Sequence, residues 1–405
     1  MSMAIKMDSE ASGKARPLFS FCAFHFIDDG FTDSIYLLLP FIAAELGLNF
    51  SQVGLLKGVF TGSMSLFQVP LSFLGERIGE LTVIAAGTFG LASGYLLLSR
   101  VHTFVAILIS LIFAKATGGG QHGLSSSLLS RVFEISGRRA AMGTYNFSGD
   151  MGKVCLPFLL AVMINLWGWR QAVSVLSIFG LAAGAILWKV AREKASRSLS
   201  SPSEEGSTSK KKDWGIQDPK SFSSLLTIGI IDITTRTALL TFLPFLLLGK
   251  GIPMNQVGFG LTLLFAGGAV GKFACGILAE WFGIIPMVVG TEVLTSAGIL
   301  SLIWSPASFT WFILPVVGIV LNGTSSVLYA TVAEMIAPSA RSRGYGLYYA
   351  ITLGSGGIAP IFYGLLTDSF GLSLTIIAIA MIVLITLPLT RYLSAPKVPA
   401  FRSSS

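Results

Sequence analysis

The feature that most constrains this chain is a series of long apolar runs that follow one another along nearly its whole length. Leu81–Ser99 and Leu372–Thr390 are two of them, and each is long enough as a helix to cross a hydrocarbon core of about 30 Å. Only 12% of the 405 residues are charged, whereas a soluble chain has about a quarter. A water-soluble fold cannot bury this much apolar surface, so the sequence predicts an all-α integral membrane protein.

About twelve such runs can be placed on the chain. The expected spans are 19–44, 52–74, 82–99, 103–128, 141–164, 171–190, 222–248, 256–278, 285–304, 310–333, 344–366 and 372–391. The one long polar segment, 191–220, is rich in Ser and charge and is expected to be a flexible cytoplasmic linker. The predicted division is therefore an N-terminal tail (1–18), a six-helix bundle (19–190), the linker (191–220), a second six-helix bundle (221–392) and a C-terminal tail (393–405).

The basic residues are unevenly distributed between the two sides that these spans define. The outside loops contain only Arg100, Arg170 and Lys250, and the remaining loop bases lie on the side of the termini and the linker. This asymmetry predicts a bacterial-type inner (plasma) membrane protein with both termini in the cytoplasm. The same asymmetry explains the net charge of +8, so we do not expect nucleic acid as a partner.

The two halves of the chain repeat one another at an offset of about 204 residues. Asp28 corresponds to Asp232, Glu76 to Glu280 and, at an offset of 203, Gly168 to Gly371. Two parallel six-helix repeats with a site at their interface are a transporter architecture. The repeat therefore predicts two pseudo-symmetric bundles that carry a solute across the bilayer.

Two polar loops carry a resemblance to a known family. The loop 72–79 contains Gly75, Glu76, Arg77 and Gly79, and its counterpart 276–283 contains Glu280 and Gly283. Both resemble the loop signature of the major facilitator superfamily, which implies that these residues form gating loops. The stretch from His25 to Asp29 and the stretch Gly118–His122 are similar to the fosmidomycin-resistance branch of efflux proteins, although His122 is followed by Gly123 and Leu124 where that branch has Pro and Glu.

The first expected helix carries its polar residues on one face. His25, Asp28, Asp29, Asp33 and Tyr36 lie within one arc of it, opposite an apolar face. Ionisable groups at membrane depth cost roughly 2.5–3.5 kcal/mol each, so they face a cavity or one another. Adjacent carboxylates repel, which favours at least one of the three acids as a proton carrier. We expect His25, Asp28, Asp29, Asp33 and, from the fourth span, His122 to couple protons; in the alternative, the acids only pair with lysines and the histidines only pack.

A second set of polar residues points to a substrate site. The resemblance implies that the cavity is lined by the first, fourth, seventh and tenth helices and by parts of the second, fifth, eighth and eleventh. The expected substrate-binding residues are Tyr36, Lys115, Asn146, Asp150, Lys153, Asp232, Arg236 and Lys272. The bases could hold an anionic group; in the alternative, they form an internal charge network, in which Asp232 and Arg236 neutralise one another as i,i+4 neighbours. We expect Lys57 to snorkel toward the outer surface.

These features favour a secondary active transporter, a proton-coupled exporter of a small anionic or amphiphilic compound that works by alternating access. The alternative is a proton-coupled importer of an organic or inorganic anion, and a non-transporting sensor or scaffold is less favoured. The run Gly118–Gly120 lacks the Lys-Ser/Thr of a phosphate-binding loop and is expected to permit a bend or a close helix contact. We expect no enzymatic activity, cofactor or metal, and a monomer whose partners are its small-molecule substrate, protons and the lipid bilayer.

Overall fold

The structure, a computed structural model, describes residues 2–132, 138–198, 215–337 and 341–393. Most of the expected linker (199–214) and nearly all of the expected C-terminal tail (394–405) lie outside the described residues. The described residues are helical almost throughout, and their one isolated β-bridge joins Ile216 to Ile336. This bridge fixes the last residues of the expected linker against the turn between two helices of the second half.

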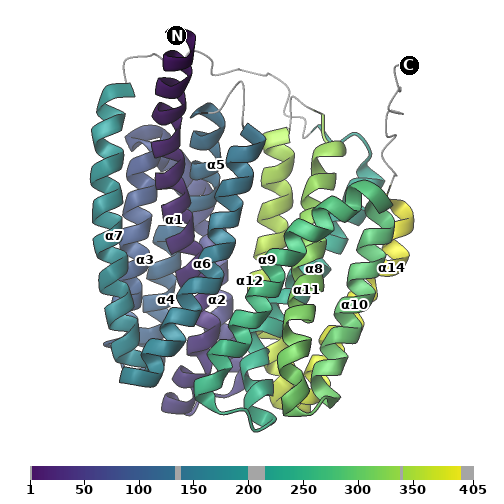
Figure 1. Ribbon diagram of the computed structural model, residues 1–405. Helices are drawn as coiled ribbons and strands as arrows, with labels where there is room; N and C mark the ends of the chain where they lie inside the picture. Colours follow the sequence, from purple (N-terminus) through teal and green to yellow (C-terminus); the bar gives the residue numbers. More distant parts are fainter. Residues whose placement is uncertain (1, 133–137, 199–214, 338–340, 394–405) are drawn as a thin grey trace.

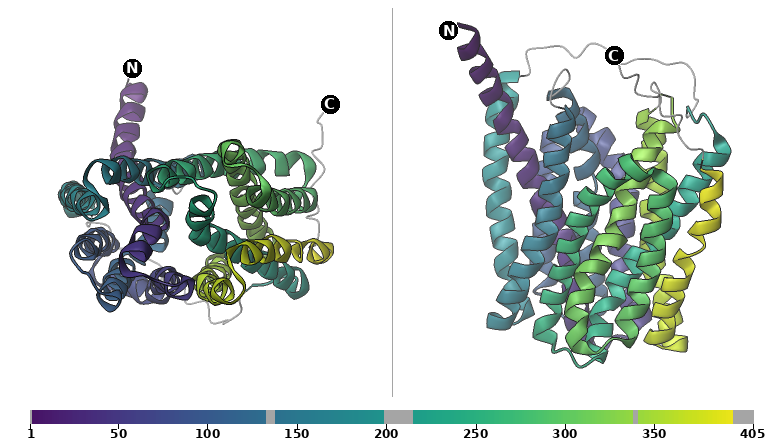
Figure 2. Two further views of the ribbon diagram at one scale, coloured as in Figure 1. Left: turned by 90° about the horizontal axis from the view of Figure 1, so that it is seen from below. Right: turned by 45° about the vertical axis from the view of Figure 1, so that its right-hand side comes forward.

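Two groups of helices lie side by side (Figures 1 and 2). The first half contains α1 (Ser2–Leu46), α2 (Phe50–Ile78), α3 (Glu80–Leu98), α4 (Phe104–Gly118), α5 (Gln121–Val132), α6 (Arg138–Trp167) and α7 (Trp169–Ser198). The second half contains α8 (Pro219–Gly249), α9 (Met254–Phe282), α10 (Ile284–Trp304), α11 (Ala307–Glu334), α12 (Arg341–Phe370), α13 (Leu372–Val383), α14 (Thr386–Leu389) and the 3₁₀ turn Thr390–Tyr392. Successive spans run up and down, with α5 continuing α4 and α14 continuing α13, so α1 begins at the same end of the molecule as α7 finishes (Figure 1).

Ten segments of the described chain are long and apolar enough to cross a membrane. They include α4 with α5 as one span and α13 with α14 as another, and α1 and α2 complete the twelve. Large apolar side chains cover the outside of the bundle, among them Phe273, Trp281 and Phe312, each 74% exposed. The predicted fold, two six-helix bundles that span a membrane, is confirmed.

The helices differ from the predicted spans in three details. The span expected at 103–128 is found as one span, but it consists of two helices, because α4 ends at Gly118 and α5 begins at Gln121. The glycines between them pack closely against α2, since a Cβ on Gly119 would lie 2.9 Å from the carbonyl oxygen of Met64. The expected N-terminal tail instead continues α1 back to Ser2, and the last span is divided at residues 384–385.

The internal repeat is expressed in the turns between helices. Gly47, Gly79 and Gly168 have φ angles of 62°, 97° and 79°, and their counterparts Gly251, Gly283 and Gly371 have 81°, 85° and 85°. Side chains with a Cβ rarely adopt this left-handed region, whereas glycine does so at little cost. The two halves therefore reverse direction with the same glycines at the same places.

The halves contact one another closely at the end where α2 begins. Asp368 near the end of α12 accepts hydrogen bonds from the backbone N–H groups of Phe50 at 2.9 Å and Ser51 at 2.8 Å, and from the Ser51 hydroxyl. At the pseudo-symmetric position, Asn165 near the end of α6 donates to the carbonyl oxygen of Asn255 at 3.3 Å. A Cβ on Gly54 would lie 2.1 Å from the carbonyl oxygen of Pro360, so α2 and α12 touch backbone to backbone here.

Candidate functional site

Asp28 is the centre of the first of two linked ion-pair clusters on α1. Its carboxylate is 2% exposed, and the Lys115 ammonium from α4 lies 3.1 Å from Oδ2. Lys115 also donates to the Thr32 hydroxyl at 2.6 Å and is itself 1% exposed. Buried charges need both a partner and further hydrogen bonds, and this pair has both. The structure therefore places Lys115 in an internal ion pair, the alternative that the sequence left open.

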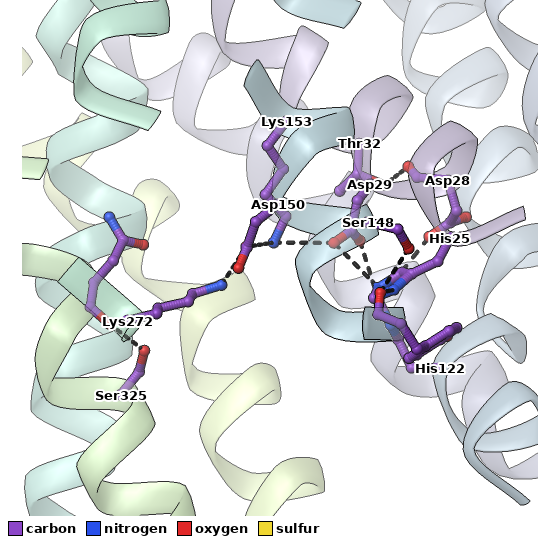
Figure 3. A network of polar contacts seen from close by, with 12 residues as sticks. His25, Asp28, Asp29, Thr32, His122, Ser148, Asp150, Lys153, Lys272 and Ser325 are labelled. Atoms are coloured by element: carbon purple, nitrogen blue, oxygen red, sulfur yellow. Dashed lines mark hydrogen bonds and ion pairs between the residues drawn. The ribbon is translucent and has the colours of Figure 1, made fainter. Parts of the chain in front are cut away.

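Asp29 is the centre of the second cluster and contacts three side chains (Figure 3). Its Oδ2 lies 3.2 Å from His25 Nε2 and 3.1 Å from the Lys153 ammonium of α6, and its Oδ1 lies 3.5 Å from His122 Nε2 of α5. The other ring nitrogen of His25, Nδ1, lies 2.8 Å from the carbonyl oxygen of Tyr145. A carbonyl can only accept, so Nδ1 must carry a hydrogen.

The hydrogen on His25 Nδ1 determines how Nε2 of the same ring can interact with Asp29. If Nδ1 is protonated, a neutral imidazole presents the lone pair of Nε2 to the carboxylate, and lone pair and anion repel. A proton between the two groups would remove this repulsion at the 3.2 Å contact. The sequence placed both residues on one face of the first helix, but it did not indicate the Tyr145 carbonyl that makes their arrangement specific.

Asp150 connects the first half to the second. Its Oδ1 lies 2.5 Å from the ammonium of Lys272 on α9 and 3.8 Å from that of Lys153, three residues along α6 (Figure 3). The side chains of Lys153 and Lys272 are 27% and 29% exposed. One carboxylate is therefore shared by an ammonium from each half, and both lysine side chains are partly exposed.

Asp232 and Arg236 of α8 lie apart from these clusters and do not form the direct i,i+4 ion pair that the sequence suggested as an alternative. The described residues hold no direct ion pair between them, although their charges interact. Arg236 donates to Ser325 at 3.3 Å and reaches Asn322 at 3.5 Å, both on α11. The guanidinium points toward α11 because that helix offers oxygen acceptors, so the predicted i,i+4 pair acts only at longer range.

The remaining predicted residues have different surroundings. Asp33 interacts electrostatically with Lys153 and Lys57, whereas Asn146 is exposed on α6. Tyr36 is buried, and the Lys57 ammonium lies 4.2 Å from its ring centroid. The prediction that Lys57 snorkels is wrong: the side chain is 3% exposed, because α12 packs on α2 beside it and leaves the ammonium a cation–π contact.

The predicted gating loops lie at the end where α1 begins, away from the clusters. Gly79 and Gly283 form the turns from α2 to α3 and from α9 to α10, and Glu76, Arg77 and Glu280 are exposed there. Gly75 is buried, and a Cβ on it would lie 2.7 Å from Leu124 of α5. Each predicted gating residue therefore lies at or near its own turn, and none of them contacts the charged clusters in the described part of the chain.

One triad has the donor types of a metal site. Ligand atoms of His25, Asp29 and His122 all lie within 4.8 Å of one another. The Lys153 ammonium, 3.1 Å from Asp29, already balances that carboxylate, and a divalent cation would be repelled by it. The donor set therefore fits a proton better than a metal ion.

Sequence reasoning missed one buried acid, Glu292 on α10, which is 1% exposed. It was the only acid in the expected span 285–304. A lone acid in a membrane span is a functional signal in itself, so the sequence contained the indication.

Comparison with known proteins agrees with this architecture. The model of the Major Facilitator Superfamily matches residues 21–222 and 225–404. An uncharacterized MFS-type transporter of Bacillus subtilis is 25% identical over 88% of this chain and 88% of its own length. The fosmidomycin resistance protein of Escherichia coli is 21% identical over 86% of each chain. A bacterial homolog of the human lysosomal transporter Spinster, in an inward-facing and occupied conformation, has a TM-score of 0.79 at 15% identity, over 92% of this chain and 95% of its own.

Proposed function

The chain belongs to the major facilitator superfamily, and on that premise we propose that it is a proton-coupled exporter of a small anionic or amphiphilic compound. In this proposal the two halves rock against each other and expose the space between them to either side in turn. The protein lies in a bacterial-type inner membrane with both termini in the cytoplasm, as its loop charges favour.

The observation that carries the proposal is the contact between His25 and Asp29. Because His25 Nδ1 faces a carbonyl, a proton between Nε2 and Asp29 Oδ2 makes this contact attractive, which supports a proton site here. Lys153 and His122 also lie within 3.1 and 3.5 Å of Asp29, and the more closely they hold this carboxylate, the more readily the proton leaves it. A change in the position of α6 relative to α1 would therefore release or bind one proton.

The substrate class follows from the bases at the boundary between the halves. Lys153 and Lys272 share Asp150, are partly exposed and come from helices of different halves. An ammonium pair of this kind attracts a carboxylate or phosphonate as a point charge. An anion that binds both lysines would join the halves in place of Asp150.

Export is favoured over uptake by the likeness to a relative named for drug resistance, and the available driving force is adequate. One proton that crosses about 150 mV supplies about 3.5 kcal/mol, which corresponds to a concentration ratio of several hundred.

The experiment begins with purified full-length protein and a panel of small phosphonates and carboxylates that includes fosmidomycin. Compounds that raise the melting temperature are then tested in proteoliposomes with an imposed pH gradient. The wild type should concentrate the compound against its gradient and move protons with it. Asp29→Asn should abolish uphill movement but keep downhill exchange, because the anion site is intact while the proton site is lost.

The matched control is Glu45→Gln, which removes an acid from the same helix far from the clusters and should leave uphill transport unchanged. Uphill transport by Asp29→Asn at the wild-type rate would remove Asp29 from the coupling step. Movement of the compound into cells rather than out of them would replace export with uptake.

A further inference from the structure

Glu292 lies in the middle of α10, and no step proposed above uses it. The carboxyl group is 1% exposed, and its Oε1 has no hydrogen-bond partner in the described part of the chain. Thr295, one turn further along the same face of α10, is 2% exposed and its hydroxyl oxygen is also without a partner there. Buried polar atoms nearly always have partners, so an ionised carboxylate does not fit this place.

The charges around Glu292 do not balance either. Asp232 and Arg236 of α8 are the charged side chains that act on it. Tyr329 and Tyr348, on α11 and α12, act on Asp232 and Arg236. Arg236 donates from Nη1 to Asn322 and Ser325, and Oε1 of Glu292 receives no hydrogen bond from it or from any other group in the described part of the chain. Two carboxyl groups therefore share the field of one guanidinium, and two buried carboxylates with one cation repel each other.

We propose that Asp232 and Glu292 hold one exchangeable proton between them, so that the C-terminal half contains a second proton site. Glu292 carries the proton while Arg236 neutralises Asp232, and as a neutral acid Glu292 is compatible with its apolar surroundings. This site does not depend on the substrate or on the direction of transport. It involves none of the residues that surround Asp29.

The internal repeat indicates that the fold itself does not need this acid. The counterpart of Glu292 in the first half, at the offset of 204 residues, is Thr88 on α3. Thr88 is 3% exposed and donates its hydroxyl hydrogen to the carbonyl oxygen of Ile84 at 3.1 Å. Glu292→Thr therefore places in the second half the residue that the first half already has at this position.

The test is infrared spectroscopy of the purified full chain between about pH 6 and pH 9, a range in which an ordinary glutamic acid is ionised throughout. The wild type should have a carbonyl band of a protonated carboxylic acid that shifts in D₂O. Glu292→Gln and Glu292→Thr should each lose the intensity of one carboxyl group from this band. Identical bands in the wild type and in both variants would overturn the proposal.

Asp232→Asn keeps the test decisive if the Glu292 variants fail to fold. Without the like charge of Asp232, Glu292 can ionise beside Arg236, so its band should weaken at neutral pH. An unchanged band in Asp232→Asn would contradict a shared proton.

A sodium ion is the other cation that could neutralise Glu292. The melting temperature of the wild type should be the same in sodium chloride and in choline chloride at equal ionic strength. A stabilisation by sodium that Glu292→Gln abolishes would overturn the proton in favour of sodium. Since neither measurement involves transport, the result is independent of whether the chain proves to be an exporter.

Discussion

The two halves share a backbone plan but distribute charge differently. Asp28 and Asp232 correspond in the repeat and are 2% and 5% exposed. In the first half the acid has a lysine from the neighbouring helix at 3.1 Å. In the second half the base, Arg236, is on the same helix and hydrogen-bonds elsewhere. The acid is thus common to both halves, whereas the base lies at a different position in each. The buried acid of the first half is closely paired, and the second half has more buried acids than nearby bases.

The largest expected effect is on the buried pair of the first half. Lys115→Met should destabilise the protein by about 3–5 kcal/mol, because it leaves the Asp28 carboxylate buried without its partner. Arg236→Met in the second half should cost less, about 1–3 kcal/mol, because it removes the hydrogen bonds of one charged group and a cation that neutralises Asp232 only from beyond ion-pair distance. Unfolding in detergent measures both.

The double variant Asp28→Asn/Lys115→Met is the control for this comparison and should recover most of the loss. Equal costs for Lys115→Met and Arg236→Met would mean that the halves do not differ in how closely their charges are paired.

The next prediction compares the part of α6 that packs on the proposed proton site with the rest of that helix. A Cβ on Gly149 would lie 2.5 Å from His25 Cε1 and 2.6 Å from Asp29 Oδ2. Gly149→Ala should therefore cost about 1–3 kcal/mol through overpacking and should shift the pH dependence of transport.

Gly143 on the same helix and its counterpart Gly346 in the second half have no atom within 4 Å of such a Cβ. Alanine at either place should be neutral or stabilising by up to about 1 kcal/mol. A loss of stability at Gly143 as large as that at Gly149 would show that α6 tolerates no added Cβ, and that the proton site is not special.

A smaller effect is expected where the halves meet beside α2. Asp368→Ala should cost about 0.5–2 kcal/mol, as for the loss of a helix cap, and should favour opening at this end. Asn165→Ala should cost less, since it removes a single neutral hydrogen bond. The distribution of distances between spin labels at Ala44 and Ser369 should broaden more in Asp368→Ala than in Asn165→Ala. A larger effect of Asn165→Ala would contradict a capping role of Asp368 at the start of α2.

The smallest effect concerns the surface pair of Glu45 and Arg170, 2.6 Å apart. The hydrogen bond from Arg170 lowers the pKa of Glu45, so the stabilisation is complete above the usual glutamate pKa and is lost as pH falls through the lowered value. Glu45→Gln should remove at most about 1 kcal/mol of stability at neutral pH and reduce its loss in acid. At the same end of the second half, Lys250 donates to the carbonyl oxygens of Ile303 and Ser305, which are neutral acceptors that do not titrate. If Glu45→Gln loses as much stability in acid as the wild type, that loss arises from other groups.

Most of the fold could be predicted from the sequence, because apolar runs and loop charges constrain a membrane protein strongly. The break between α4 and α5 was only partly foreseen, since Gly118–Gly120 indicated a bend but not where a helix would restart. Which helices carry buried charged side chains could also be predicted. Which group each of these bases contacts could not.

The choice of partner depends on distances between helices, which no single-chain pattern contains. Lys115 could have faced a substrate, but Asp28 lies 3.1 Å away. Lys57 could have reached the surface, but its side chain is buried and its ammonium lies 4.2 Å from the ring centroid of Tyr36. The proposed proton between His25 and Asp29 depends on a backbone carbonyl 120 residues away from His25, and a sequence motif does not record carbonyl directions.

Asp150 has a consequence for how tightly a substrate can bind. Its carboxylate contacts one ammonium from each half, so it is an intramolecular competitor for the proposed anion. An incoming anion gains the two lysines only as Asp150 loses them, and its measured affinity reports the difference between the two interactions. Such a competitor also prevents the lysines from being left unpaired when no substrate is bound. If the proposed anion binds there, its binding is weakened but readily reversed, as a carrier that releases its cargo in every cycle requires.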